Sequence, residues 1–268
     1  MIFITAVAVC LCGCTQPAKP IDNMEPAQEN SPIANTSADH PIVKTYIVGI
    51  DGEYPPYSFI DKTGTPQGFD VESIEWIGTE MGFNIIIQAL AWDGIIPALN
   101  AGKIDMVYSG MTSTDERKEQ VNFSKPYWKV NQSVTKHDEG LLTFEDFKAG
   151  KSRVGAQRGA TGALWVEKNL IDTGMMQAEQ LVTYDNFPLV VTDLQNKRID
   201  FAIHDRTPTL DAIAGKPLTI AGEIDTGEEY CVAIRKSDPE LLSTINTGIS
   251  LLMQSPKWGE LKAKYKMQ

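Results

Sequence analysis

An alternation of strand-like and helix-like patterns restricts the fold of this chain more than any other feature. It begins near Lys44, and three strand-like runs alternate with two helical patterns, in the order 45–50, 70–82, 83–90, 93–99 and 104–109. The first helical pattern has Asp70 as its expected N-cap and stops at Gly82. This βαβαβ order predicts parallel strands with helices on the faces of the sheet.

A second series repeats this plan. Its helical and strand-like segments are 144–150, 152–156, 161–170, 180–184, 186–197 and 199–205. The segments "LNAGKIDMVYSG" (99–110) and "LQNKRIDFAIHD" (194–205) share a helix end, a basic residue, an Ile-Asp pair and a buried strand. Residues 238–266 predict two amphipathic helices, which need an apolar surface and are expected to cover the first module. The chain therefore predicts two α/β lobes, each built on an open sheet.

The N-terminal residues are typical of an exported protein. Residues 1–14, "MIFITAVAVCLCGC", form an uncharged apolar run too short to span a bilayer. Leu11 to Cys14 has the shape of a lipobox, so we expect a signal peptide and a lipid on Cys14. An ordinary signal peptide or a buried N-terminal segment is the alternative, because no basic residue precedes the run. Residues 15–42, rich in Pro, Ala, Asn and Ser, predict a flexible tether.

Composition excludes several classes of function. The net charge of −11, without a basic patch, argues against a nucleic-acid partner. Three of the four cysteines lie in the first 14 residues, so Cys231 has no partner for a disulfide framework. The sequence has three histidines, no Cys/His cluster, no nucleophile elbow and no phosphate loop. We therefore expect no metal, no cofactor and no catalytic residue.

Polar and aromatic residues follow the strand-like runs. Asp51, Tyr54 and Tyr57 come directly after residues 45–50, in a loop that two prolines stiffen. Because open α/β sheets bind ligands beyond the carboxyl ends of their strands, a cleft between the two lobes is the expected site.

Two further loops carry groups suited to a zwitterion. The segment "SGMTSTDER" contributes Thr112 and Arg117, and a guanidinium can form two parallel bonds to a carboxylate. The segment "GAQRGATG" opens a helix near Thr161, whose backbone N–H groups favour an anion. Asp205 ends a strand, where it can pair with an ammonium group, and Trp92 can help the tyrosines to enclose a side chain. Each residue alone is as readily explained as a cap, a turn or a solvated face; the combination favours a ligand site.

Residues 43–268 resemble the polar amino acid binding family of extracytoplasmic solute-binding proteins, which deliver substrate to ABC importers. The most specific segments are "GFDVESIEWIGTEMG", "WDGIIPALNAGKIDMVYSGMTSTDERKEQVNFSKPYW" and "VGAQRGATG". The resemblance implies an α/β, two-lobed periplasmic-binding-protein fold, or Venus flytrap. Two open sheets are joined by two crossover strands, with the ligand cleft between the lobes. The implied ranges are 43–135 plus 229–268 for lobe 1, 136–228 for lobe 2, and 129–136 and 228–235 for the crossovers.

The resemblance also assigns roles to residues. It implies that Arg117 holds the α-carboxylate of an amino acid and that Asp205 holds its α-ammonium. The other implied ligand-binding residues are Asp51, Tyr54, Tyr57, Trp92, Ser109, Gly110, Met111, Thr112 and Thr161. Ala160 stands where the family commonly has a hydroxyl residue. Asp51 and Glu53 favour a cationic or amide side chain, so arginine, lysine, histidine and glutamine are the expected ligands. Gln157 and Arg158 are the groups that would suit an acidic ligand instead.

The function implied is that of the substrate-binding lipoprotein of an ABC-type amino acid importer, a monomer with a membrane permease as partner. It would lie outside the cytoplasmic membrane, in the periplasm or on the outer cell surface. Two alternatives come from the same fold: a cleft enzyme similar to cyclohexadienyl or arogenate dehydratase, with Asp51, Glu53 or Asp205 as general acid or base, and a ligand-sensing module.

Overall fold

The computed structural model describes residues 43–267, so the predicted signal peptide, Cys14 and the tether lie outside the described residues. The first sheet has the strand order β5-β1-β6-β13-β7. Its strands are β1 (Thr45–Ile50), β5 (Asn84–Ala89), β6 (Met106–Val107), β7 (Asn122–Phe123) and β13 (Ala233–Ile234). β1 runs parallel to β5 and β6, as the βαβαβ pattern predicts, whereas β13 is antiparallel to β6 and β7.

The second sheet has the order β10-β9-β11-β8-β12. Its strands are β8 (Trp128–His137), β9 (Val154–Gln157), β10 (Leu181–Tyr184), β11 (Phe201–Asp205) and β12 (Leu218–Tyr230). β9 is parallel to β10 and β11, and β8 is antiparallel to β11 and β12. Both sheets are therefore mixed.

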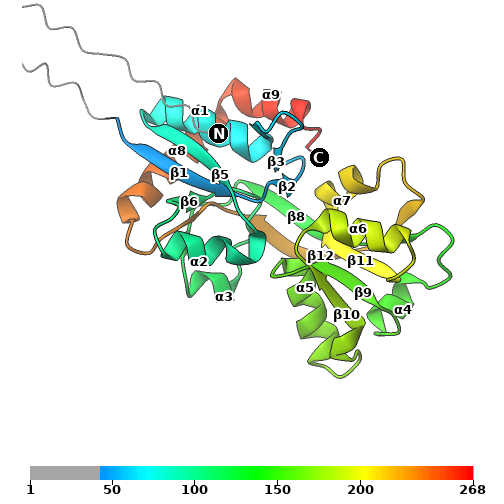
Figure 1. Ribbon diagram of the computed structural model, residues 1–268. Helices are drawn as coiled ribbons and strands as arrows, with labels where there is room; N and C mark the ends of the chain where they lie inside the picture. Colours follow the sequence, from blue (N-terminus) through cyan, green and yellow to red (C-terminus); the bar gives the residue numbers. More distant parts are fainter. Residues whose placement is uncertain (1–42, 268) are drawn as a thin grey trace, which may run out of the picture. The chain divides into compact units, whose positions relative to one another are not determined.

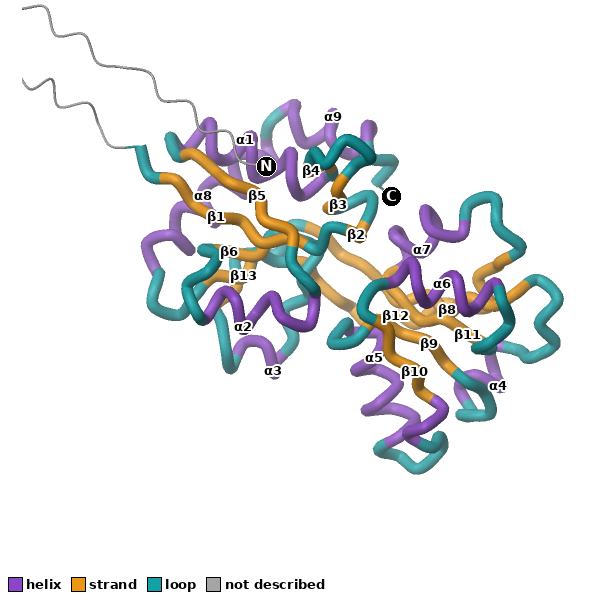
Figure 2. The backbone as a smooth tube through the Cα atoms, viewed as in Figure 1, coloured by secondary structure: helices purple, strands orange, loops and turns teal. Residues whose placement is uncertain are grey.

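The chain enters the second lobe along β8 and leaves it along β12, and these two strands pair with each other (Figures 1 and 2). The predicted crossover 129–136 lies within β8. The predicted crossover 228–235 covers the end of β12 and all of β13. A small third sheet of β2 (Glu53–Tyr54), β3 (Ser58–Ile60) and β4 (Pro66–Gln67) orders the Pro-rich loop after β1.

The C-terminal helices cover the first lobe, as the sequence predicts. α8 (Pro239–Gln254) and α9 (Pro256–Lys264) pack with α1 (Phe69–Met81) over one face of the sheet (Figure 1). Leu241, Ile245 and Leu252 join Ile74 and Ile77 in a single buried cluster. The opposite face carries η1 (Trp92–Gly94), α2 (Ile95–Asn100) and α3 (Asp115–Lys118). Burial of these apolar faces is the main source of stability in such a lobe.

One detail of α1 differs from the sequence prediction. Gly82 ends the helix in the left-handed conformation as expected, but Gly68 and not Asp70 is the N-cap. Asp70 is fully buried, and its carboxylate accepts hydrogen bonds from Gly110 N–H at 2.6 Å and Tyr127 O–H at 2.8 Å. The N-cap prediction is wrong because the aspartate faces the lobe interior, where it holds the loop that follows β6.

Helices pack on both faces of the second sheet (Figure 2). They are α4 (Phe144–Lys148), α5 (Thr161–Val166) with its π-helical continuation η2 (Glu167–Ile171), η3 (Ala178–Gln180), α6 (Phe187–Gln195) and α7 (Arg206–Ile213). Sequence patterns did not predict α7, whose low amphipathicity gives little periodic signal.

The internal repeat has a structural cause. In the first lobe the Asp105 carboxylate accepts from Ile47 N–H at 2.8 Å, and Ile104 packs closely on Gly49. In the second lobe the Asp200 carboxylate accepts from the N–H of Arg153 at 2.7 Å, and Ile199 packs closely on Gly155. Each Ile-Asp pair thus anchors the start of its strand to the neighbouring parallel strand, and each glycine leaves room for the isoleucine.

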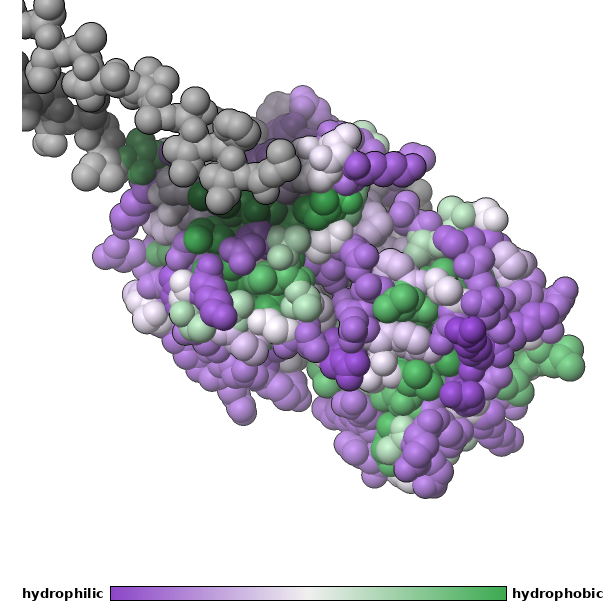
Figure 3. Space-filling model, in the orientation of Figure 1, coloured by the Kyte–Doolittle hydropathy of each residue, from purple (hydrophilic) through white to green (hydrophobic). Residues whose placement is uncertain are grey.

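Most of the surface visible in Figure 3 is hydrophilic, with separate hydrophobic patches. Large exposed apolar side chains such as Ile86 and Leu141 are scattered, which is common on globular proteins. Among the described residues, no helix has the length and apolar character needed to cross a membrane.

Candidate functional site

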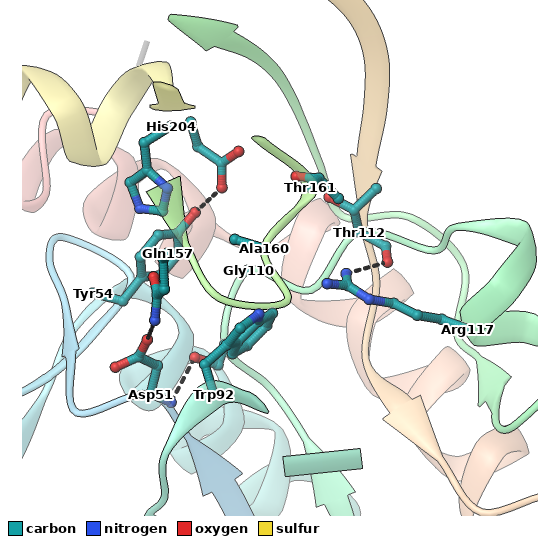
Figure 4. Close-up of a pocket in the computed structure, with 12 residues that line it drawn as sticks. Asp51, Tyr54, Trp92, Gly110, Thr112, Arg117, Gln157, Ala160, Thr161 and His204 are labelled. Carbon is teal, nitrogen blue, oxygen red and sulfur yellow. Dashed lines mark hydrogen bonds between the residues drawn. The ribbon is translucent and has the colours of Figure 1, made fainter. Parts of the chain in front are cut away.

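A small cavity of about 20 Å³ lies between the two lobes, beyond the carboxyl ends of β1, β9 and β11 (Figure 4). The first lobe lines it with Asp51, Tyr54, Trp92, Ser109, Gly110, Thr112 and Arg117, and the second with Gln157, Ala160, Thr161, His204 and Asp205. The structure thus brings together all of the predicted ligand-binding residues except Tyr57 and Met111.

Tyr57 and Met111 lie behind the cavity. The Tyr57 ring stacks on Tyr54 at 5.4 Å between centroids and meets Tyr230 edge-on at 5.1 Å. Met111 packs with Ile95 in the hydrophobic cluster under α2. Both side chains are fully buried and support the wall of the cavity from inside the first lobe.

Arg117 occupies one end of the cavity. Thr114 caps the short helix α3 by accepting from the backbone N–H of Arg117, which fixes the point where this side chain leaves the backbone. The buried guanidinium donates to the backbone carbonyl of Thr112 at 2.8 Å and to that of Gly159 at 3.0 Å. It also lies 5.4 Å from the centre of the Trp92 ring, a cation–π distance.

The electrostatic surroundings of Arg117 favour an anion. Burial lowers the pKa of the Arg117 guanidinium, while Glu228 and Asp205 raise it. An arginine keeps its proton at neutral pH under such opposing influences. Within the described residues, both hydrogen bonds of the Arg117 guanidinium go to neutral backbone carbonyls. A buried positive charge therefore faces the cavity, with the hydroxyls of Thr112 and Thr161 beside it (Figure 4).

Asp205 lies at the end of β11 and is surrounded by donors. Tyr230 O–H donates to its Oδ2 at 2.7 Å, Tyr54 O–H donates to the same oxygen, and Gln132 donates to Oδ1. Burial raises the pKa of the Asp205 carboxyl, and the bonds from Tyr54, Tyr230 and Gln132 lower it. Tyr230 and Gln132 were not among the predicted ligand-binding residues. The only available signal was their position in the two predicted crossovers.

The other end of the cavity holds Asp51, Gln157 and His204. The Asp51 carboxylate accepts from the side-chain amide of Gln157 at 2.8 Å and from the backbone N–H of Glu53 at 2.9 Å. His204 is buried, and neither ring nitrogen has a hydrogen-bond partner among the described residues. Burial lowers the pKa of His204 to about 4, so its imidazole is neutral at physiological pH. His204 and Ala160 were not predicted to bind ligand.

Glu53 and Arg158 do not line this cavity. The Glu53 side chain is exposed, and Arg158 is half exposed, with carboxylates of Asp185 at 3.1 Å and Asp93 at 3.6 Å. Arg158 thus joins the two lobes near the surface, where solvent weakens charge interactions.

Several bonds join the lobes directly around the cavity. Tyr54 of the first lobe contacts Asp205 of the second, and Asp51 contacts Gln157. The Gly159 carbonyl accepts from both Arg117 and the Trp92 indole N–H, the latter at 3.2 Å. A solute enclosed here would contact groups of both lobes.

Comparison with known proteins agrees with this architecture. The family model of "Bacterial extracellular solute-binding proteins, family 3" matches residues 46–268. This chain belongs to that family. Family membership confirms the predicted fold and the predicted class of function, that of a solute-binding protein.

Individual relatives align with this chain over most of their length. The L-cystine-binding protein TcyJ of Escherichia coli K12 is 32% identical over 225 residues, which cover 82% of each chain. A probable histidine-binding protein of Neisseria gonorrhoeae is 28% identical over 226 residues, 83% of each chain. The structure of an ancestral arginine-binding protein bound to arginine superposes with a TM-score of 0.74 at 32% identity, covering 82% of this chain and 97% of that chain.

Proposed function

We propose that this family 3 protein binds a polar or basic L-amino acid in the cleft between its lobes and presents it, as a monomer, to an ABC permease. One observation carries the proposal: Arg117 of the first lobe and Asp205 of the second are buried at the same cavity with opposite charges. Relatives named for cystine, histidine and arginine support the ligand class.

Arg117 is the proposed partner of the α-carboxylate. Its guanidinium can form two parallel charge-assisted bonds to a carboxylate, each contributing about 1.5 to 3 kcal/mol. The hydroxyl of Thr161 lines the same end of the cavity and accepts from Gln132, so it can donate its proton to the carboxylate.

Asp205 is the proposed partner of the α-ammonium. Its Oδ2 accepts from two tyrosines and its Oδ1 from Gln132, which fix the carboxylate in one orientation. A carboxylate held in this way interacts with an ammonium group without a further loss of side-chain entropy.

The side chain of the ligand is proposed to lie between the Tyr54 and Trp92 rings and to end near Asp51, Gln157 and His204. Asp51 favours a side chain that donates hydrogen bonds, and the neutral imidazole of His204 can donate with one nitrogen and accept with the other. Arginine, lysine, histidine and glutamine fit these requirements.

Transport follows from closure of the cleft. A ligand that contacts both lobes stabilises the closed arrangement by its differential affinity for that state. The permease would then recognise the closed surface.

We also propose that a lipid on Cys14 anchors the protein outside the membrane. Mass spectrometry of the N-terminal peptide should find a diacylglyceryl group that is absent after Cys14→Ala.

Calorimetry with the twenty L-amino acids and cystine tests the function. At least one ligand from the polar or basic set should bind with micromolar affinity or better. If arginine binds, two truncated analogues test the orientation: agmatine lacks the α-carboxylate and 5-guanidinopentanoate lacks the α-ammonium, so both should bind at least 100-fold more weakly. The absence of binding by every ligand would contradict the proposal.

A further inference from the structure

A bulge in the crossover strand β12 brings an acidic residue close to the cleft. In the pairing of β12 with β8, Ile224 lies opposite Gln132 and Glu228 lies opposite Val130. One residue of β8 therefore faces three residues of β12, and Gly227 takes the left-handed conformation with φ of 61°. A bulge redirects the side chains of the strand that carries it. Glu228 is the first paired residue after the bulge.

The Glu228 carboxylate connects the first lobe to both crossover strands. Its Oε2 accepts from the hydroxyl of Thr112 at 2.7 Å, and its Oε1 accepts from the Gln132 amide at 3.0 Å. Thr226, within the bulge, donates to the same Oε1 at 2.9 Å. Thr112 lines the cavity and Glu228 does not, so Glu228 lies one layer behind the ligand-binding groups.

Gln132 extends the connection into the second lobe. Its fully buried amide nitrogen also bonds to the Asp205 carboxylate and lies 3.1 Å from the hydroxyl of Thr161. A continuous path of hydrogen bonds therefore runs from Thr112 through Glu228 and Gln132 to Asp205. This path joins the Arg117 end of the cavity, where the α-carboxylate is proposed to bind, to Asp205, where the α-ammonium is proposed to bind. It runs through the two strands that connect the lobes.

We propose that Glu228 is a positioning residue for the ligand cleft: it orients Thr112 directly, and it orients Asp205 through Gln132. This inference rests on the proposed function, since its effect is on the affinity for the amino acid. Glu228 also places a second carboxylate beside Gln132, and the charges of Glu228 and Asp205 both raise the pKa of the Arg117 guanidinium.

Replacement of Glu228 tests the role. Glu228→Ala removes the acceptor for both Thr112 and Gln132 and should weaken binding of the best ligand found by calorimetry roughly 10- to 100-fold. Glu228→Gln keeps the shape but has a single acceptor oxygen, so its loss should be intermediate. The control is Glu229→Gln, because the adjacent Glu229 carboxylate is partly exposed and faces Lys129 at 3.5 Å; its affinity should stay within twofold of wild type.

A double-mutant cycle separates positioning from general destabilisation. If Glu228 acts through Gln132, the loss in Glu228→Ala/Gln132→Ala should be clearly smaller than the product of the two single losses. Independent effects of the two changes, or wild-type affinity of both Glu228 variants, would overturn the positioning role. If the alanine variant does not fold, as judged by circular dichroism, Glu228→Gln carries the same test. A wild-type protein that binds no amino acid would overturn the proposed function as well, so the two failures are distinguishable.

Discussion

The side-chain amide of Gln157 donates to the carboxylate of Asp51 across the cleft at 2.8 Å, and these two residues occupy equivalent places in the two lobes. Asp51 directly follows β1, and Gln157 is the last residue of β9. Asp51 lies two residues after Gly49, on which Ile104 packs. Gln157 lies two residues after Gly155, on which Ile199 packs. The internal repeat therefore brings an acid and an amide together at the proposed side-chain end of the site.

This pairing predicts that Gln157 adjusts ligand selectivity. Gln157→Ala frees one oxygen of Asp51, so the affinity for arginine relative to glutamine should rise, by about tenfold if one charge-assisted bond to the ligand is gained. Calorimetry with arginine and with glutamine on the same preparation of the variant measures the ratio of the two affinities. This ratio does not depend on the fraction of the protein that is active. An unchanged ratio would show that the ligand side chain does not reach Asp51.

Arg117 is predicted to be essential for every amino acid ligand. Arg117→Ala should weaken binding at least 100-fold, because the α-carboxylate loses two charge-assisted bonds. Lys118→Ala is the matched control, since Lys118 is exposed and pairs only with Asp115 at 3.0 Å among the described residues. Near-wild-type affinity of the Arg117 variant would place the carboxylate elsewhere.

Gly110 is predicted to tolerate no side chain. Its φ is 53°, and a Cβ at this position would lie 2.6 Å from Cε1 of Tyr54, a residue that contacts Asp205. Gly110→Ala should therefore reduce both ligand affinity and thermal stability. Gly102→Ala is the control: its φ is 71° but nothing lies within 4 Å of the added carbon, so the change should cost only about 1 kcal/mol of stability. Equal effects of the two changes would argue against a steric cause at Gly110.

Asp70 is predicted to make stability depend on pH. Burial raises the pKa of Asp70 from 3.8 to about 7, so the folded state holds a proton that the unfolded state releases between these values. This group's contribution to stability is therefore fully present below pH 4 and is lost as the pH rises to 7. The free energy of unfolding of Asp70→Asn, measured with urea, should increase relative to wild type over this interval, by about 4 kcal/mol.

The comparison at Asp70 needs a pH-independent reference. The amide in Asp70→Asn also changes the bonds to Gly110 and Tyr127, and this offset should be the same at every pH. A constant difference between variant and wild type from pH 4 to 7 would mean that folding does not raise the pKa of Asp70.

Local patterns in the sequence predicted much of this protein, because they depend on interactions between residues close in the chain. Periodicity and turn residues gave the βα units, and the repeated Ile-Asp pairs indicated two related lobes. The residues after the strands of each lobe predicted most of the cavity lining, since parallel strands place their carboxyl ends at one edge of a sheet.

The tertiary structure decided how those residues are held. Asp70 looked like a helix cap, but packing of α1 against the first lobe turned its carboxylate inward to Gly110 and Tyr127. Gln132 and Glu228 had no local signal, because their bonds join positions 96 residues apart and depend on the pairing of β8 with β12 and on the bulge in β12. Sequence determined which groups lie at the strand ends. Only the pairing of distant strands determined which of those groups support one another, because buried polar groups take their partners from whatever the fold places beside them.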